Sequence, residues 1–237
     1  MMEAVRLLGF GNGGWAAALL SASAVTLLLS IAGFALGAVF GGIAAAARVG
    51  GSRAPAFLAE GYGTVFRGIP DLLTIYLLYF GGSMALTTVA HLFGAAGFFG
   101  LPAFATGTLA IGVISGAYQA EVYRGAYLAV DRGQAEAAYA HGLSKYLTLR
   151  LVILPQLMRY AIPGLGNVWQ LVLKDSALIS VIGLVELMRQ AQIGAGSTRQ
   201  PFVFYVAAAA LYFAIAAATG VLFRRAERIS MRGVGRS

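Results

Sequence analysis

The chain has 237 residues, of which 59% are hydrophobic and only 11% are charged, and its formal net charge is +8. A soluble domain carries about 25% charged residues, so this composition is typical of a membrane protein. The basic residues stand at the ends of apolar segments, without an aromatic-interleaved basic patch, which argues against nucleic-acid binding. Cysteine is absent, which excludes disulfides, thiolate metal sites and cysteine nucleophiles.

The apolar segments, taken in chain order, predict about five membrane-spanning helices, because a helix needs roughly 20 apolar residues to cross ~30 Å of hydrocarbon. In the first segment Gly33, Gly37 and Gly41 recur every four residues and indicate a face that packs against another helix. We therefore predict a single all-α membrane domain over residues 1–237. The spans cover about residues 15–47, 55–81, 103–130, 160–188 and 201–223, with a loop over 82–102, a polar loop over 131–159 and a turn over 194–200.

The distribution of basic residues predicts the orientation of these helices. One side of the membrane receives more of them, and that side is expected to be the cytoplasm. An odd number of spans then places the N-terminus in the periplasm and the C-terminus in the cytoplasm. The cytoplasmic set is Arg48, Arg53, Arg132, Lys145, Arg150, Arg159 and the five arginines of residues 224–237, whereas the opposite side holds Arg6, Arg189 and Arg199.

The polar loop contains the segment 136–155, EAAYAHGLSKYLTLRLVILP, which reads as two short helices at a bend. Ala135, Ala138 and Gly142 form a small-residue face at helical spacing. Ser144 is placed to cap the second helix, whose apolar face would hold Leu147, Leu151 and Leu154. This pattern fits a knob that enters a groove of another protein, and it also fits an ordinary cytoplasmic loop.

Ionisable residues at membrane depth are the candidates for function, because each costs about 2.5–3.5 kcal/mol at the centre of a helix unless it finds a partner or a wet cavity. Glu121 with Arg124, and Arg67 with Asp71, are spaced either for structural ion pairs or for contact with a substrate. Lys174 and Asp175 lie near the middle of the fourth predicted span and point about 100° apart, so they cannot simply neutralise each other. Lys174 shares a polar face with Asn167 and Gln170.

Several function classes receive no support from the sequence. The two lysines, Lys145 and Lys174, do not stand in a phosphate-binding Gly-Lys-Ser/Thr motif, so the chain is not itself an ATPase. His91 and His141 lie in different loops without a partner at metal-ligand spacing, so no metal site is predicted. An intramembrane enzyme and a structural scaffold remain as alternatives to transport. The former lacks a nucleophile–base set, and the latter does not explain charges at membrane depth.

The segment 136–155 is similar to the "EAA" loop of permease subunits in binding-protein-dependent ABC importers, with Val152 where isoleucine is usual. Residues 60–71 (EGYGTVFRGIPD), 116–126 (GAYQAEVYRGA) and 174–178 (KDSAL) resemble the polar amino acid branch of that family, particularly its histidine/lysine/arginine/ornithine and octopine/nopaline permeases. The resemblance covers roughly residues 15–225. It implies a type I ABC importer transmembrane domain in the bacterial inner membrane, with several passes through the lipid.

The resemblance also implies partners and site residues. The partners would be a second homologous permease, two ATPase subunits that bind ATP and Mg, and a periplasmic substrate-binding protein; the chain itself would hold no cofactor. The substrate would be a polar, basic amino acid or an opine. Its charged groups would meet the substrate-binding residues Lys174, Asp175, Glu121 and Asp71. The ATPase subunits would dock on the coupling residues Glu136, Ala137, Ala138, Gly142, Leu154 and Pro155.

Overall fold

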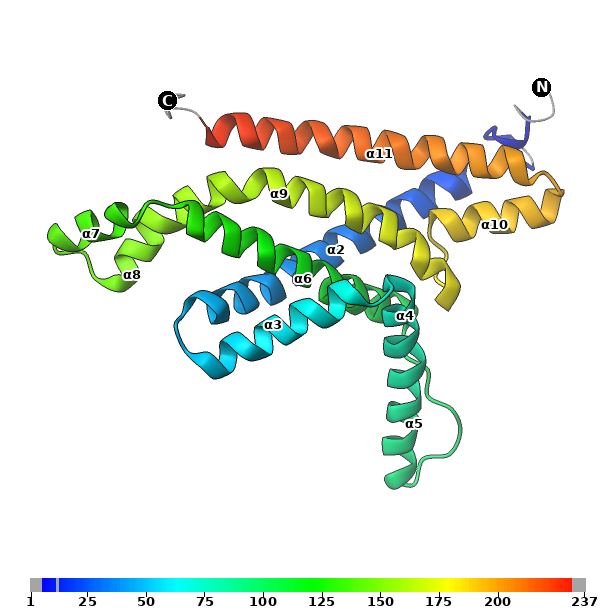
Figure 1. Cartoon of the computed structure of the whole chain (residues 1–237). Helices are drawn as coiled ribbons and strands as arrows, with labels where there is room; N and C mark the ends of the chain where they lie inside the picture. The colour runs from blue at the N-terminus through cyan, green and yellow to red at the C-terminus, as the bar shows by residue number, and fades with distance from the viewer. Residues whose placement is uncertain (1–5, 12, 232–237) are drawn as a thin grey trace.

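The computed structural model describes residues 6–11 and 13–231, and within these ranges the chain folds into helices and turns without a β-strand. The predicted all-α fold is therefore confirmed (Figure 1). Arg232 and Arg236 of the arginine tail lie outside the described residues. The elements are α2 (Ala16–Val49), α3 (Arg53–Gly68), α4 (Asp71–Tyr76), η1 (Leu77–Gly81), α5 (Gly82–Leu92), α6 (Ala103–Ala129), α7 (Arg132–Ala140), α8 (Lys145–Thr148), η2 (Leu149–Ile153), α9 (Leu154–Asp175), η3 (Ser176–Ile182), α10 (Leu187–Thr198) and α11 (Pro201–Ser230).

Helices α2 and α6 form the centre of the bundle and pack at very short range. A Cβ atom added to Gly41 would lie 2.8 Å from Gln119 Cβ and 2.9 Å from the Gly116 carbonyl oxygen of α6. Absence of a side chain at this position therefore lets the two backbones approach each other, as small residues do in membrane bundles. Buried Gln119 adds a hydrogen bond from its amide Nε2 to the Phe34 carbonyl of α2, at 3.0 Å. The predicted glycine packing face is confirmed.

The predicted second span, 55–81, does not form one helix. Helix α3 ends at Gly68, Ile69 is extended at ψ 149°, and a new helical run begins at Asp71. Pro70 explains the break, because a residue before proline is pushed out of the helical region. The run then continues through α4, η1 and α5 to Leu92, so residues 82–92 are helical and not part of a loop. In Figure 1 this run projects sideways from the bundle as an arm.

The predicted fourth span, 160–188, also has different bounds. Helix α9 begins earlier, at Leu154, and ends at Asp175, where the 3-10 segment η3 takes over. Lys174 and Asp175 therefore lie in the last turn of a helix and not in the middle of one. Helix α10 extends to Thr198, so most of the predicted turn at 194–200 is helical, and the chain reverses at Arg199 and Gln200.

The C-terminal end of α11 lies at the same end of the helix bundle as α7 and α8. Helix α11 runs along α9 to reach that end, whereas α2 begins at the opposite end (Figure 1). By length and composition, α2, the run Asp71–Leu92 and α11 are each apolar enough to cross a membrane. Helices α6 and α9 are also long, but they carry the polar residues that form the candidate site.

Candidate functional site

Only α7 is a short separate helix in the segment 132–155, because α8 is the start of a helical run that continues through η2 and α9 to Asp175. The second predicted short helix is therefore wrong in its length, but both helices are capped by their own residues. The Asp131 carboxylate accepts a hydrogen bond from the Gly133 backbone N–H at 2.6 Å at the start of α7. At the end of α7, Gly142 has φ +79°, and the N–H groups of Gly142 and Leu143 bond the carbonyls of Tyr139 and Ala138. This pattern of two bonds around a left-handed residue is a Schellman motif, which favours glycine. The Ser144 hydroxyl accepts from Leu147 N–H, so the predicted cap of the second helix is confirmed.

The small-residue face of α7 is turned partly toward the chain itself. Ala138 is only 7% exposed. Ala135 lines a cavity of about 570 Å³ at the base of α2 and α6, together with Arg48 and Arg124. The surface that α7 leaves open instead includes Glu136 and Ala137. Of the other predicted coupling residues, Gly142, Leu154 and Pro155 are exposed as well.

Glu121 stands at the centre of a cluster of arginines, which we call the arginine cluster. Its Oε1 contacts Arg48 Nη1 from the last turn of α2 at 2.5 Å and Arg67 Nη2 from the last turn of α3 at 2.9 Å. Its Oε2 contacts Arg124 Nη2 on its own helix at 3.1 Å. The predicted Glu121–Arg124 ion pair is thus present, but Arg67 pairs with Glu121 and not with Asp71. Because both Glu121 oxygens are occupied, this carboxylate is poorly placed to receive a cationic substrate.

Asp71 and Asp175 lie at opposite ends of two helices. Asp71 begins α4, directly after the break at Pro70, and Asp175 ends α9. The segment η3, which directly follows Asp175, packs against α4, and both α4 and η3 contact α6. Asp175 is 8% exposed and Asp71 is half-buried. In the described part of the chain, all the ion pairs involve Glu121, so these two aspartates have no salt-bridge partner there.

Lys174 points away from this pair of aspartates. Its side chain is exposed and lines an apolar cavity of about 540 Å³ between α9 and α11, together with Gln170, Leu173 and Tyr212. Asn167 and Gln170 continue the same polar face along α11, where they line a second, smaller cavity of about 310 Å³. Of the four predicted substrate-binding residues, Asp71 and Asp175 thus belong to neighbouring elements, whereas the Lys174 side chain lines the cavity toward α11.

Sequence reasoning missed one charged residue, Glu186, which is fully buried. Its carboxylate caps α10 by accepting from the Arg189 and Met188 N–H groups at 2.7 and 2.9 Å. It also accepts from Tyr212 Oη of α11 at 2.8 Å and from Thr26 Oγ1 of α2 at 3.3 Å. The available signal was a glutamate inside the predicted span 160–188, since a charge at that depth needs partners.

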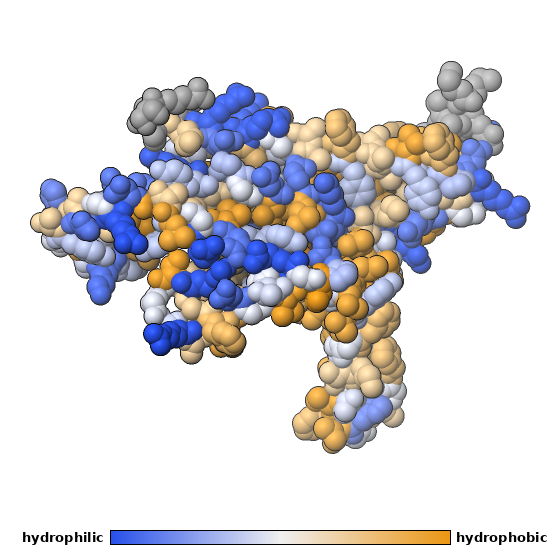
Figure 2. Space-filling view, in the orientation of Figure 1, coloured by the Kyte–Doolittle hydropathy of each residue, from blue (hydrophilic) through white to orange (hydrophobic). Residues whose placement is uncertain are grey.

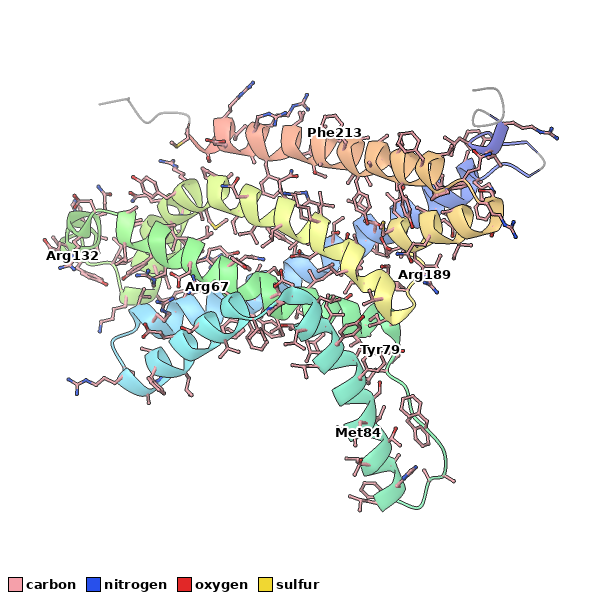
Figure 3. All side chains as sticks on the ribbon, turned by 45° about the vertical axis from the view of Figure 1, so that its right-hand side comes forward. Arg67, Tyr79, Met84, Arg132, Arg189 and Phe213 are labelled. Carbon is pink, nitrogen blue, oxygen red and sulfur yellow. The ribbon has the colours of Figure 1, made fainter. Side chains whose placement is uncertain are left out.

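A hydrophilic band covers the C-terminal half of α6, between α9 and α3, and is bordered by hydrophobic surface (Figure 2). Arg67 lies in the region where α3 approaches α6 (Figure 3). Charged side chains on an open face cannot be left against lipid at this depth without a large cost. The arrangement can therefore hold a charged solute in a wet path. Among the described residues there is no group of three His, Asp or Glu side chains that could hold a metal ion.

Comparison with known proteins gives the class of this one. Residues 37–229 match the family described as the binding-protein-dependent transport system inner membrane component. Since the match covers most of the chain, this protein belongs to that family: it is a multi-pass permease subunit of the inner membrane and not an enzyme.

Individual relatives agree with this assignment over their full length. The chain is 57% identical to the octopine transport system permease protein OccQ of Rhizobium radiobacter, over 99% of both chains. It is 45% identical to the nopaline transport system permease protein NocQ of Agrobacterium fabrum, over 96% of this chain and 97% of the relative. A crystal structure of an amino acid ABC transporter with histidines matches with a TM-score of 0.75 and 33% identity, covering 90% of this chain and 94% of the other.

Proposed function

We propose that this permease subunit carries a cationic amino acid or an opine, and that Asp71 and Asp175 bind its cationic group. The observation behind this proposal is that two carboxylates, at the start of α4 and at the end of α9, lie on neighbouring elements without a salt-bridge partner in the described chain. Two close carboxylates at membrane depth attract a guanidinium or ammonium group strongly, because charge-assisted hydrogen bonds gain strength where water is scarce. The octopine, nopaline and amino acid transporters among the relatives support a substrate of this kind.

The path for this substrate would run along α6. Tyr118 and Glu121 lie on α6 itself, and the elements that hold the two aspartates pack against it. The C-terminal half of α6 carries the hydrophilic band of Figure 2. A polar strip of this kind needs either water or a second protein surface in front of it. A second homologous permease that faces α6 would enclose the strip between the two subunits and separate it from lipid.

The arm formed by α4, η1 and α5 supports a second permease as a partner. Leu77, Phe80, Met84 and Leu92 are all more than half exposed, so the arm has little contact with its own chain. We propose that it packs across the second subunit. The chain has no native cysteine, so a single Met84→Cys would cross-link uniquely to a cysteine placed in the partner. A Phe213→Cys variant, exposed on α11 and far from the arm in Figure 3, serves as the negative control.

The two ends of the helix bundle are the proposed docking surfaces for the remaining partners. ATPase subunits, which supply the ATP and Mg sites, would dock on α7 through Glu136, Ala137 and the exposed Gly142. A periplasmic binding protein would deliver substrate at the opposite end, near α10. Helices α6 and α9 would then cross the membrane together with α2, the arm and α11, in agreement with five spans.

A transport assay with matched variants tests the substrate site. In vesicles that hold the complete transporter, Asp175→Asn should lower the uptake of a guanidino substrate at least tenfold, because loss of a charge-assisted contact costs about 1.5–3 kcal/mol. Basal ATP hydrolysis should persist. Lys174→Met, at the neighbouring position on the other face of α9, should keep near-normal uptake. The proposal fails if Lys174→Met abolishes uptake while Asp175→Asn leaves it unchanged.

A further inference from the structure

The arginine cluster carries more positive charge than its own carboxylate neutralises. Three guanidinium groups surround Glu121, so two positive charges remain without a partner inside the cluster. The side chains of Arg67 and Arg124 are each 35% exposed, so part of each guanidinium group is reachable. Surplus charge in a half-buried membrane site is unfavourable unless an anion or water reaches it.

Hydrogen-bond donors are left over as well. Arg67 uses Nε for the Gly63 carbonyl and Nη2 for Glu121, and Arg124 uses Nε and Nη2 for Glu121. Among the bonds of the described residues, none involves Nη1 of either side chain. The guanidinium fork is suited to hold a carboxylate through two parallel bonds. These two arginines thus offer both the charge and the donors for an additional carboxylate.

Other acidic groups nearby do not fill this role for Arg67. Asp131 and Glu136 line the cavity below the cluster with Arg48, Arg124 and Arg132, and Arg67 is not part of that lining. The Asp131 carboxylate is already engaged with the Gly133 N–H. No salt bridge joins either acidic residue to the cluster within the part of the chain that the structure describes.

The cluster adjoins the two aspartates. Arg67 and Asp71 flank the helix break at Pro70, and Tyr118 precedes Glu121 by three residues on α6. Helix α3 with Arg67, helix α4 with Asp71 and the segment η3 that follows Asp175 all contact α6. An acidic and a basic subsite therefore lie next to each other along α6.

We propose that Arg67 and Arg124 form a second subsite, which binds carboxylate groups of a substrate whose cationic end lies at Asp71 and Asp175. This inference rests on the proposed function. The two surplus positive charges of the arginine cluster can be neutralised by two carboxylates of the substrate. The two aspartates can accept several hydrogen bonds from a single guanidinium group of the substrate. The preferred substrate class is thus a guanidino amino acid with a second carboxylate on its α-nitrogen substituent, and plain arginine binds more weakly.

Binding measurements on the complete transporter in nanodiscs, without the binding protein, test the second subsite. Three radiolabelled probes share the guanidino side chain and differ in their carboxylates: octopine has two, the second on its α-nitrogen substituent, L-arginine has one, and arginine amide has none. Arg67→Gln should weaken octopine binding about ten- to hundredfold, the loss expected for one charge-assisted contact, and leave arginine amide within about twofold. Arg53→Gln, on the same helix but outside the cluster, is the matched control and should change none of the three affinities.

Each alternative gives a different result. Equal weakening of all three probes by Arg67→Gln, or no weakening, overturns the second subsite. Stabilisation of the wild-type complex by inorganic phosphate in an Arg67-dependent manner, without any Arg67 effect on octopine, assigns the cluster to an inorganic anion and also overturns it. If Arg67→Gln does not assemble, Arg67→Lys decides, because lysine keeps the charge and loses the fork; it should weaken octopine and spare arginine amide. Failure of the wild type to bind any probe refutes the proposed function itself.

Discussion

Glu186 connects three helices through one buried carboxylate. It accepts hydrogen bonds from Tyr212 of α11 and Thr26 of α2 while it caps α10. Removal of this acceptor would leave several buried donors without a partner, each at a cost of about 1–3 kcal/mol. Glu186→Ala should therefore strongly lower the thermal stability of the detergent-solubilised subunit, measured by the size-exclusion profile of a fluorescent fusion after heating.

Tyr212→Phe is the graded control for this prediction. It removes one donor and leaves the carboxylate with its other partners, so its effect should be clearly smaller than that of Glu186→Ala. Equal stability of Glu186→Ala and the wild type would contradict the role of Glu186 as a connector.

Substitutions of Gly142 can distinguish the effect of its backbone conformation from the effect of its contact with an ATPase subunit. Its φ of +79° is unfavourable for most residues, but asparagine and aspartate tolerate this region better than other side chains. An added side chain would meet open space within the subunit. Gly142→Asp and Gly142→Asn should therefore insert similarly, and only the charge of the former must be desolvated against an ATPase surface.

We expect Gly142→Asp to uncouple ATP hydrolysis from uptake more severely than Gly142→Asn. Uptake and hydrolysis, measured in the same reconstituted vesicles, give the ratio directly. Identical ratios for the two variants would indicate that the backbone conformation, and not docking, governs this position.

At the scale of elements, the contact between α2 and α6 offers two adjacent glycines with opposite surroundings. A methyl group on Gly41 would collide with the backbone of α6, whereas on Gly42 it would meet nothing within 4 Å. Gly41→Ala should destabilise the subunit by about 1–3 kcal/mol, as expected for overpacking. Gly42→Ala should be neutral or slightly stabilising, because alanine favours the helix. Thermal unfolding of both variants checks this, and equal effects would refute close packing at Gly41.

The sequence predicted elements well where apolar length and small-residue spacing dominated. Helix α2 and its glycine face followed from these signals. The break at Pro70 was not predicted, because the apolar run on either side of it resembled one continuous span. The early end of α9 was missed for a related reason: the apolar residues of η3 prolong the hydrophobic pattern although the backbone changes at Ser176.

The candidate site was predicted in its residue types but not in its pairing. The spacing of Glu121 and Arg124 along one helix correctly suggested an ion pair between them. It could not reveal that Arg48 and Arg67 reach the same carboxylate from two other helices, since such contacts depend on helix packing. The different directions of Lys174 and Asp175 followed from helix geometry, but which of them lies toward Asp71 required the arrangement of α4 beside η3.

At the scale of the whole molecule, orientation in the membrane remains a prediction from the basic residues. The end of α11 and the segment around α7 lie at the same end of the bundle (Figure 1), so both should be cytoplasmic. An alkaline phosphatase fused after Ser237, which is active only in the periplasm, should be silent. The same enzyme fused before Met1, behind an export signal, should be active. Activity of the C-terminal fusion would place α7 on the wrong side for an ATPase.

The short distance between α2 and α6 has a mechanical consequence. With a carbonyl of one helix against a glycine of the other, neither rotation nor sliding is possible without collision, so the two helices should move as one stiff rod. Only Val130 and Asp131 separate α6 from α7. A displacement of α7 by an ATPase would thus be transmitted almost directly to α6, whose 27 residues span about 40 Å. The helix break at Pro70 and the segment η3 are where the backbone would then bend.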